Sequence, residues 1–105
     1  MISVGDIVIR DFFLGFIKIH ILYHAGERPF CGVEMMEELG RHGYSVSPGL
    51  IYPTLHSLEE KGYLKSRRIV VRGRARRYYE ATEEGLKMLE EAKGKIRELV
   101  DEVMR

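Results

Sequence analysis

Residues 47–77 read SPGLIYPTLHSLEEKGYLKSRRIVVRGRARR, and this stretch decides the fold. Its first half predicts a short helix, because Ser47 can cap a helix and Pro48 suits the first helical position. Pro53 removes one backbone hydrogen bond within that helix, and Gly62 is the expected terminator. Three apolar residues repeat at helical spacing and mark the buried side: Ile51, Leu55 and Leu58.

After Gly62 the sequence becomes rich in β-branched and aromatic residues, which are typical of strands. We expect strands from Tyr63 to Val71 and from Arg77 to Ala81, joined by a basic, glycine-containing tip at residues 72–75. The net charge of the chain is only +1, yet residues 65–77 hold seven of its 17 Lys and Arg residues and no Asp or Glu. A solvated loop would mix both signs, so this run favours the binding of a polyanion.

Helical periodicity predicts three further helices around this stretch. The first runs from Asp6 to His24 as one helix, with a break near Gly15 as an alternative, and a turn follows at residues 26–29. The last runs from Thr82, a suitable cap, to Arg105. The second runs from Gly32 to Arg41, with three residues on its buried side: Val33, Met36 and Leu39.

This order of elements is that of a winged helix-turn-helix domain, a fold that is mainly α with a small β-hairpin. A chain of 105 residues has the length of one domain. We expect residues 1–81 to form the winged-helix DNA-binding domain, with its N-terminal helix, and residues 82–105 to form a C-terminal dimerisation helix of the same domain.

The predicted DNA contacts come from the third helix and from the hairpin, or wing. A short helix can offer its side chains to base edges in a major groove, and arginines at a hairpin tip can contact phosphates or a minor groove. Tyr52 has an alternative role in packing against the wing, and Thr54 lies near the buried edge. Arg67, Arg68 and Arg77 alternate along the strands, where some can simply flank the sheet. The predicted DNA-binding residues are Ser47, Tyr52, Thr54, His56, Ser57, Arg72, Arg74 and Arg76.

Five segments together resemble the PadR family of transcriptional regulators. They are Gly32 with its helix, the run Ser47–Leu55, the run Leu58–Leu64, the run Arg76–Tyr79, and the run Thr82–Gly85. The resemblance covers residues 12–90 and implies a homodimeric winged-helix repressor that binds double-stranded DNA. It also implies dimerisation through C-terminal helices and, in some members, release by a small aromatic or drug-like effector.

The chain departs from the family pattern at two points. Val33 stands where the family often has tyrosine after the glycine, and a single helix follows the wing. The second departure predicts a short-form member without a separate effector domain.

An apolar stripe runs along the last helix, which is longer than a compact domain of this size can cover. Pairing this stripe with a second copy, and with the aromatic first helix, would set two third helices one DNA turn apart. The operator is therefore expected to be an inverted repeat. The aromatic side of the first helix can also be core or effector pocket. The predicted dimer contacts are Phe12, Phe16, Leu89, Ile96, Leu99, Val100 and Val103.

Other classes of function are less well matched by the sequence. It shows no nucleophile–base pair, no paired carboxylates and no phosphate-binding glycine loop, so we expect neither an enzyme nor a cofactor. A protein-interaction module would be expected to have a neutral or acidic wing. A small-molecule sensor and a metal sensor remain alternatives, the latter because His20 and His24 are spaced i, i+4 with Cys31 and His42 nearby in sequence. No metal site is predicted.

The sequence also bears on the compartment. A single cysteine excludes an intramolecular disulfide. No run of about 18 apolar residues occurs, and the N-terminus does not resemble a signal peptide. We therefore expect a cytoplasmic protein without membrane contact.

Overall fold

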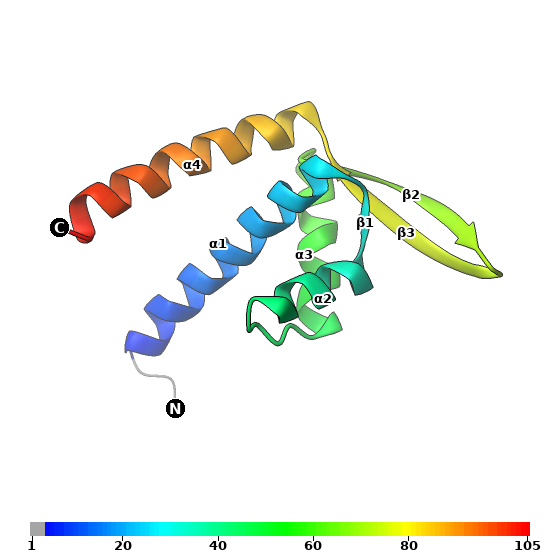
Figure 1. Cartoon of the computed structure of the whole chain (residues 1–105), viewed down its shortest axis with the longest axis horizontal. Helices are drawn as coiled ribbons and strands as arrows, with labels where there is room; N and C mark the ends of the chain where they lie inside the picture. The colour runs from blue at the N-terminus through cyan, green and yellow to red at the C-terminus, as the bar shows by residue number, and fades with distance from the viewer. Residues whose placement is uncertain (1–3) are drawn as a thin grey trace.

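The computed structural model describes residues 4–105, with side chains from Ile7 onwards, and it is mainly α with a small sheet, as predicted (Figure 1). Helix α1 is followed by a short strand and by the helix-turn-helix pair α2 and α3. A hairpin and the long helix α4 complete the chain. The elements are α1 (Val4–Glu27), β1 (Phe30–Cys31), α2 (Gly32–Arg41), α3 (Pro48–Glu60), β2 (Leu64–Val71), β3 (Arg74–Ala81) and α4 (Glu83–Val103).

The hydrophobic core lies where the first three helices meet the base of the hairpin. Burial of each such aliphatic side chain stabilises the fold by about 1.5–3 kcal/mol. All three predicted core positions of α3 are buried. The most deeply buried side chains come from α1, α2, α3 and β2: Ile17, Ile21, Met35, Leu39, Ile51, Leu55 and Leu64.

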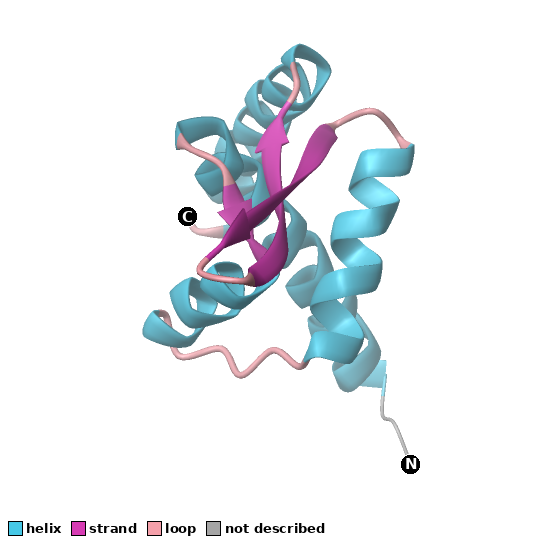
Figure 2. Cartoon of the chain, turned by 90° about the vertical axis from the view of Figure 1, so that its right-hand side faces the viewer, coloured by secondary structure: helices cyan, strands magenta, loops and turns pink. Residues whose placement is uncertain are grey.

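The hairpin is part of a three-stranded antiparallel sheet with the order β1-β3-β2 (Figure 2). Strand β1 was not predicted; it pairs Phe30 with Tyr79 of β3. Strand β3 begins at Arg74 rather than Arg77, so that the turn holds only two residues. These are Arg72 and Gly73, with φ of 53° and 75°. Two consecutive positive φ angles are those of a type I′ turn, whose twist matches that of the strands.

The structure decides between the two alternatives for α1 and corrects the turn expected after it. The helix is not broken near Gly15, and it continues through the expected turn at Gly26 as far as Glu27. A glycine inside a helix costs about 1 kcal/mol, and the tertiary packing of Ile17 and Ile21 outweighs that cost.

The length of α2 was predicted correctly, but its orientation about its axis was not. The buried residues are Gly32, Met35 and Leu39, whereas Val33 is exposed and Met36 is half-buried. Both sets have helical spacing and share Leu39, so periodicity alone could not choose between them.

Thr82 links the start of α4 to the residue that ends α3 through hydrogen bonds of its hydroxyl group. Its Oγ1 accepts a hydrogen bond from the N–H of Gly85 at 3.0 Å, which confirms the predicted cap. The same hydroxyl donates to the carbonyl of Gly62 at 2.6 Å. Gly62 itself has a φ of 83°, as expected for a residue that ends a helix. These contacts hold the hairpin base, α3 and α4 in a common arrangement.

Candidate nucleic-acid interface

Tyr52 of α3 lies between the start of α2 and the wing. Its ring lies against the start of α2: a Cβ atom at Gly32 would come within 2.4 Å of its Cε1 atom. The side chain is still 42% exposed. It also lines a cleft of about 240 Å³, shared with Ala75, Arg76 and Arg77 of the wing. Tyr52 therefore combines the packing role and the exposed position that the sequence left as alternatives.

The exposed side of α3 carries the remaining polar candidates in different environments. His56 is exposed one turn after Tyr52, so the two side chains share a face of the helix. Ser47 is exposed at the N-cap, where its carbonyl accepts from the N–H groups of Leu50 and Ile51 at 3.0 Å. The Ser47 hydroxyl makes no capping hydrogen bond.

Two predicted contacts of α3 have other surroundings. Thr54 is half-buried and its hydroxyl donates to the carbonyl of Leu50 at 2.7 Å, a bond within the helix. Ser57 is exposed but lines a separate cavity with residues of α1 and α4, such as Lys18 and Met88. The structure thus brings Tyr52 to the wing and leaves His56 exposed on the same face of α3, whereas Ser57 lines a cavity elsewhere.

The register of the hairpin divides the wing arginines between two faces. Arg68 is the direct partner of Arg77, and Ser66 is the partner of the buried Tyr79, so these residues share the face that continues the core side of the sheet. Arg77 donates to the Ser66 hydroxyl at 3.1 Å, and that hydroxyl donates to Glu59 of α3 at 2.6 Å. The face with Arg68 and Arg77 is therefore the one beside α3.

The opposite face of the wing holds the arginines that the sequence singled out. Arg72, Arg74, Arg76 and Tyr78 line one cavity with Val71. Arg72 and Arg74 are exposed at the tip, and Arg76 is half-buried.

The position of Arg76 is set by a contact with the first strand. Its Nη1 donates to the Cys31 sulfur at 3.7 Å. The buried Cys31 thus orients a wing arginine.

Arg68 and Arg77 are the residues that sequence reasoning undervalued. The sequence contained a signal for them. Once Arg72 and Gly73 are taken as a two-residue turn, the pairing of Arg68 with Arg77 follows from counting along the strands.

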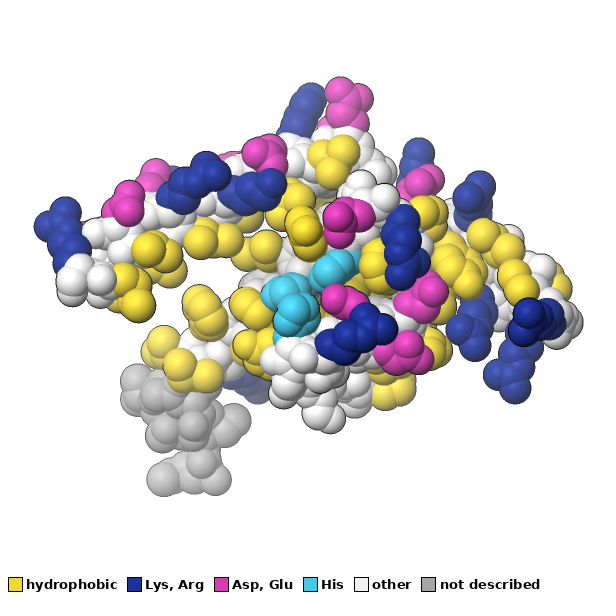
Figure 3. All heavy atoms as spheres, viewed as in Figure 1, with side chains coloured by type: hydrophobic (Ala, Val, Ile, Leu, Met, Phe, Trp, Pro, Cys, Tyr) yellow, Lys and Arg dark blue, Asp and Glu magenta, His cyan; other side chains and the backbone are white. Residues whose placement is uncertain are grey.

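Positively charged side chains gather at the outer end of the hairpin. Figure 3 shows Lys and Arg side chains around the outer end of the hairpin, whereas acidic and basic groups are mixed over α4. At the base of the hairpin Lys65 pairs with Glu80 at 3.6 Å. No acidic residue lies in the sequence between these two. The outer wing is therefore a positive projection next to the exposed face of α3.

Comparison with known proteins agrees with this geometry. The sequence model of the "Transcriptional regulator PadR-like family" matches residues 21–91. The chain belongs to this family. Its members are transcriptional regulators that bind DNA, and the match includes α2, α3, the wing and the first part of α4. The resemblance inferred from the sequence is thereby confirmed.

Individual relatives extend the match over most of the chain. A transcriptional regulator of Mycobacterium tuberculosis, Rv3488, is 47% identical over 95 residues, which are 90% of this chain and 89% of that protein. A PadR family regulator from Eggerthella lenta has a TM-score of 0.77 at 27% identity, covering 94% of this chain and 91% of its own. A PadR-like transcription factor from Bacteroides fragilis has a TM-score of 0.81 at 24% identity, covering 93% and 96%, and shows the same fold.

The structure also bears on the expected absence of membrane contact. Among the helices of residues 4–105, none is both long enough and apolar enough to cross a bilayer.

Proposed function

We propose that this PadR-like regulator binds an inverted-repeat operator as a homodimer and represses transcription. The observation that carries the proposal is that the exposed Tyr52 of α3 shares a cleft with Ala75, Arg76 and Arg77 of the arginine-rich wing. Tyr52 and His56 would meet base edges in a major groove, and Arg72 and Arg74 would meet phosphates. A bound protein of this kind blocks the DNA under its footprint, which favours repression.

The second copy is the occupant that the exposed apolar surfaces require. Exposed apolar side chains lie near the N-terminal end of α1 and along the outer half of α4. Figure 3 shows the two surfaces facing each other across open space. A patch of this size on a monomer would be unusual, and a two-fold partner can fill the gap with the same two helices. The residues concerned are Ile7, Val8, Ile9, Phe12, Ile96, Leu99, Val100 and Val103.

Two predicted dimer residues have other surroundings in the single chain. Leu89 is only 6% exposed and belongs to the core of the protomer itself. Phe16 is half-buried among aromatic rings. Its ring centroid lies 5.0 Å from that of Tyr44 and 4.3 Å from that of His20. The dimer contacts are therefore proposed for Phe12, with the exposed apolar residues before it in α1, and for the outer half of α4, without Leu89 and Phe16.

The experiment is selection of bound fragments from sheared genomic DNA, followed by footprinting of the enriched sites. The proposal expects protected inverted repeats, with half-site centres one helical turn or a multiple of it apart. Enrichment of no sequence over random fragments would contradict it, and would favour a protein-interaction role for the wing.

An effector is a further part of the proposal, favoured by one apolar cavity. The cavity has a volume of about 290 Å³ and lies between α1, α3 and α4. Its lining includes Ile19, Leu22, Leu58 and Met88, with Lys18 and Lys61 among the other lining residues. A small aromatic anion would match this combination. A thermal-shift screen of aromatic acids tests it, with Met88→Trp as the variant that fills the cavity and should abolish any shift.

A further inference from the structure

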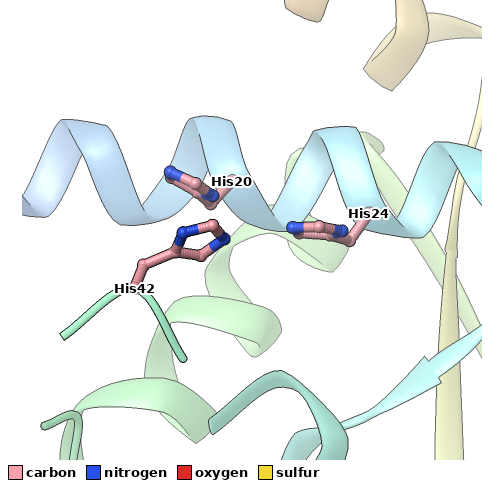
Figure 4. Close-up of side chains that lie close together, drawn as sticks. All are labelled: His20, His24 and His42. Atoms are coloured by element: carbon pink, nitrogen blue, oxygen red, sulfur yellow. The ribbon is translucent and has the colours of Figure 1, made fainter. Parts of the chain in front are cut away.

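Three histidines from two elements meet beside α1. His20 and His24 lie one turn apart on α1, and His42 directly follows α2 (Figure 4). Each histidine has one ring nitrogen in the cluster, and these three nitrogens all lie within 4.8 Å of one another. The sequence suggested the spacing of the first two, but only the fold brings His42 to them. Cys31, the other residue considered with them, instead contacts Arg76 of the wing.

Two nitrogens of the cluster are buried without a hydrogen-bond partner. They are Nδ1 of His20 and Nε2 of His24. Buried polar atoms are usually paired, because burial removes the hydrogen bonds they would make with water. Packing of the His20 ring against Phe16 explains where the ring lies, but it leaves the nitrogen without a partner.

A carboxylate lies beside two of the three histidines. Oε1 of Glu38 is 3.8 Å from Nε2 of His24 and 3.7 Å from Nε2 of His42. These separations are too long for hydrogen bonds. They are close to the roughly 3.3–3.5 Å that separates neighbouring ligands around a tetrahedral ion with bonds of about 2.0–2.1 Å.

The surrounding charges suit a cation at this point. Arg41 holds the other oxygen of Glu38, which leaves Oε1 directed at the histidines. On the far side of His24, Nδ1 lies 3.9 Å from Oε1 of Glu27. This separation is also too long for a hydrogen bond, so Glu27 contributes only its negative charge.

The protonation state of the buried ring is also suitable. Burial, with the neighbouring His42 and His24, lowers the pKa of His20 below its usual value, which favours the neutral imidazole. Neutral imidazole is the form that coordinates metals.

We propose that His20, His24 and His42, with Glu38 as the fourth ligand, bind one divalent transition-metal ion of the zinc class. Imidazole ligands favour zinc, copper and nickel, whereas calcium and magnesium require oxygen ligands. His42 is exposed, so rotation of its side chain can shorten the distance between its ring nitrogen and the other ligand atoms. Its exposed position also gives the ion a route from solvent. The ion would join α1 to the end of α2, just before residues 43–47 lead into α3.

The proposal is tested on the full chain without DNA, so its outcome is independent of the proposed function. Protein stripped with a chelator is titrated with Zn²⁺ in competition with a chromophoric chelator. We expect one ion per chain. His42→Ala and Glu38→Gln should each weaken binding by at least about 10–100-fold, the loss typical of residues around metal sites. His56→Ala is the matched control, because it removes the remaining histidine from an exposed position on α3, and it should bind Zn²⁺ like the unmodified chain.

Two further measurements guard against a variant that merely fails to fold. At free Zn²⁺ about 100 times the Kd of the unmodified protein, its Tm should rise by about 10 °C, and that of His42→Ala should rise by about half as much or less. Co²⁺ in place of Zn²⁺ should give the intense visible bands of tetrahedral coordination. Binding of less than one ion, equal affinity in His42→Ala, or a six-coordinate Co²⁺ spectrum would overturn the proposal.

Discussion

The Tyr52 ring rests directly on Gly32, so closely that a Cβ atom at position 32 would lie 2.4 Å from its Cε1 atom and 2.8 Å from its hydroxyl oxygen. The ring belongs to α3 and the glycine is the first residue of α2. The absence of a side chain at one residue therefore allows the two helices of the helix-turn-helix to approach, and it sets the position of a side chain that lines the cleft with the wing.

This contact predicts that Gly32→Ala displaces Tyr52. The free energy of unfolding should fall by about 1–3 kcal/mol, the usual cost of overpacking, and affinity for specific DNA should fall with it. Urea unfolding and fluorescence anisotropy measure the two effects. Gly40→Ala is the control on the same helix: a Cβ atom there meets nothing within 4 Å, so the change should be neutral or stabilising by up to about 1 kcal/mol. Equal effects of the two substitutions would contradict the prediction.

The wing arginines are expected to act through phosphates. Arg72→Ala combined with Arg74→Ala removes four charges from a dimer and should make the slope of log affinity against log salt less steep by about 3–4. Specific and random DNA should be affected alike, because phosphate contacts carry no sequence information.

The matched control for the wing is Lys87→Ala with Lys95→Ala. It removes the same number of charges from exposed positions on α4 and should leave the slope unchanged. If the wing variant kept the full slope, the wing would not be in the DNA interface.

His56 is expected to read sequence rather than to position the protein. His56→Ala should change the preferred bases at one position of each half-site, with a discrimination loss of about 1–3 kcal/mol per contact. Repeating the fragment selection with the variant measures the change, and the Arg72/Arg74 variant should retain the original preference. Equal loss on specific and random DNA would instead assign His56 to a phosphate contact.

The apolar side of α4 is expected to hold the dimer together. Ile96→Asp with Val100→Asp places charges on two exposed apolar positions of α4, so the variant should be a folded monomer without specific DNA binding. Light scattering and circular dichroism separate loss of the dimer from loss of the fold.

The control for the dimer introduces aspartates elsewhere on the same helix. Lys87→Asp with Lys95→Asp changes exposed polar positions and should leave the dimer intact. An unmodified protein that scatters as a monomer at micromolar concentration would contradict this account of α4, and the inverted-repeat operator with it.

Local signals were sufficient for most of the elements that form the interface. Ser47 and Pro48 mark the start of α3, the spacing of Ile51, Leu55 and Leu58 identifies its buried side, and the basic run locates the wing. Each of these features depends on residues a few positions apart, whose conformational preferences and charges act before any tertiary contact forms.

The features that the sequence left open depend on contacts between distant segments. Strand β1 forms only because β3 offers a partner to Phe30, and the buried side of α2 depends on what packs against Met35. The meeting of His42 with His20 and His24 requires α2 to end beside α1. The sequence by itself determined the order of the helices and the hairpin, the buried side of α3 and the place of the positive charge along the chain. Only the tertiary structure decided which faces and side chains meet, because packing energy between segments is not encoded in the periodicity of either one.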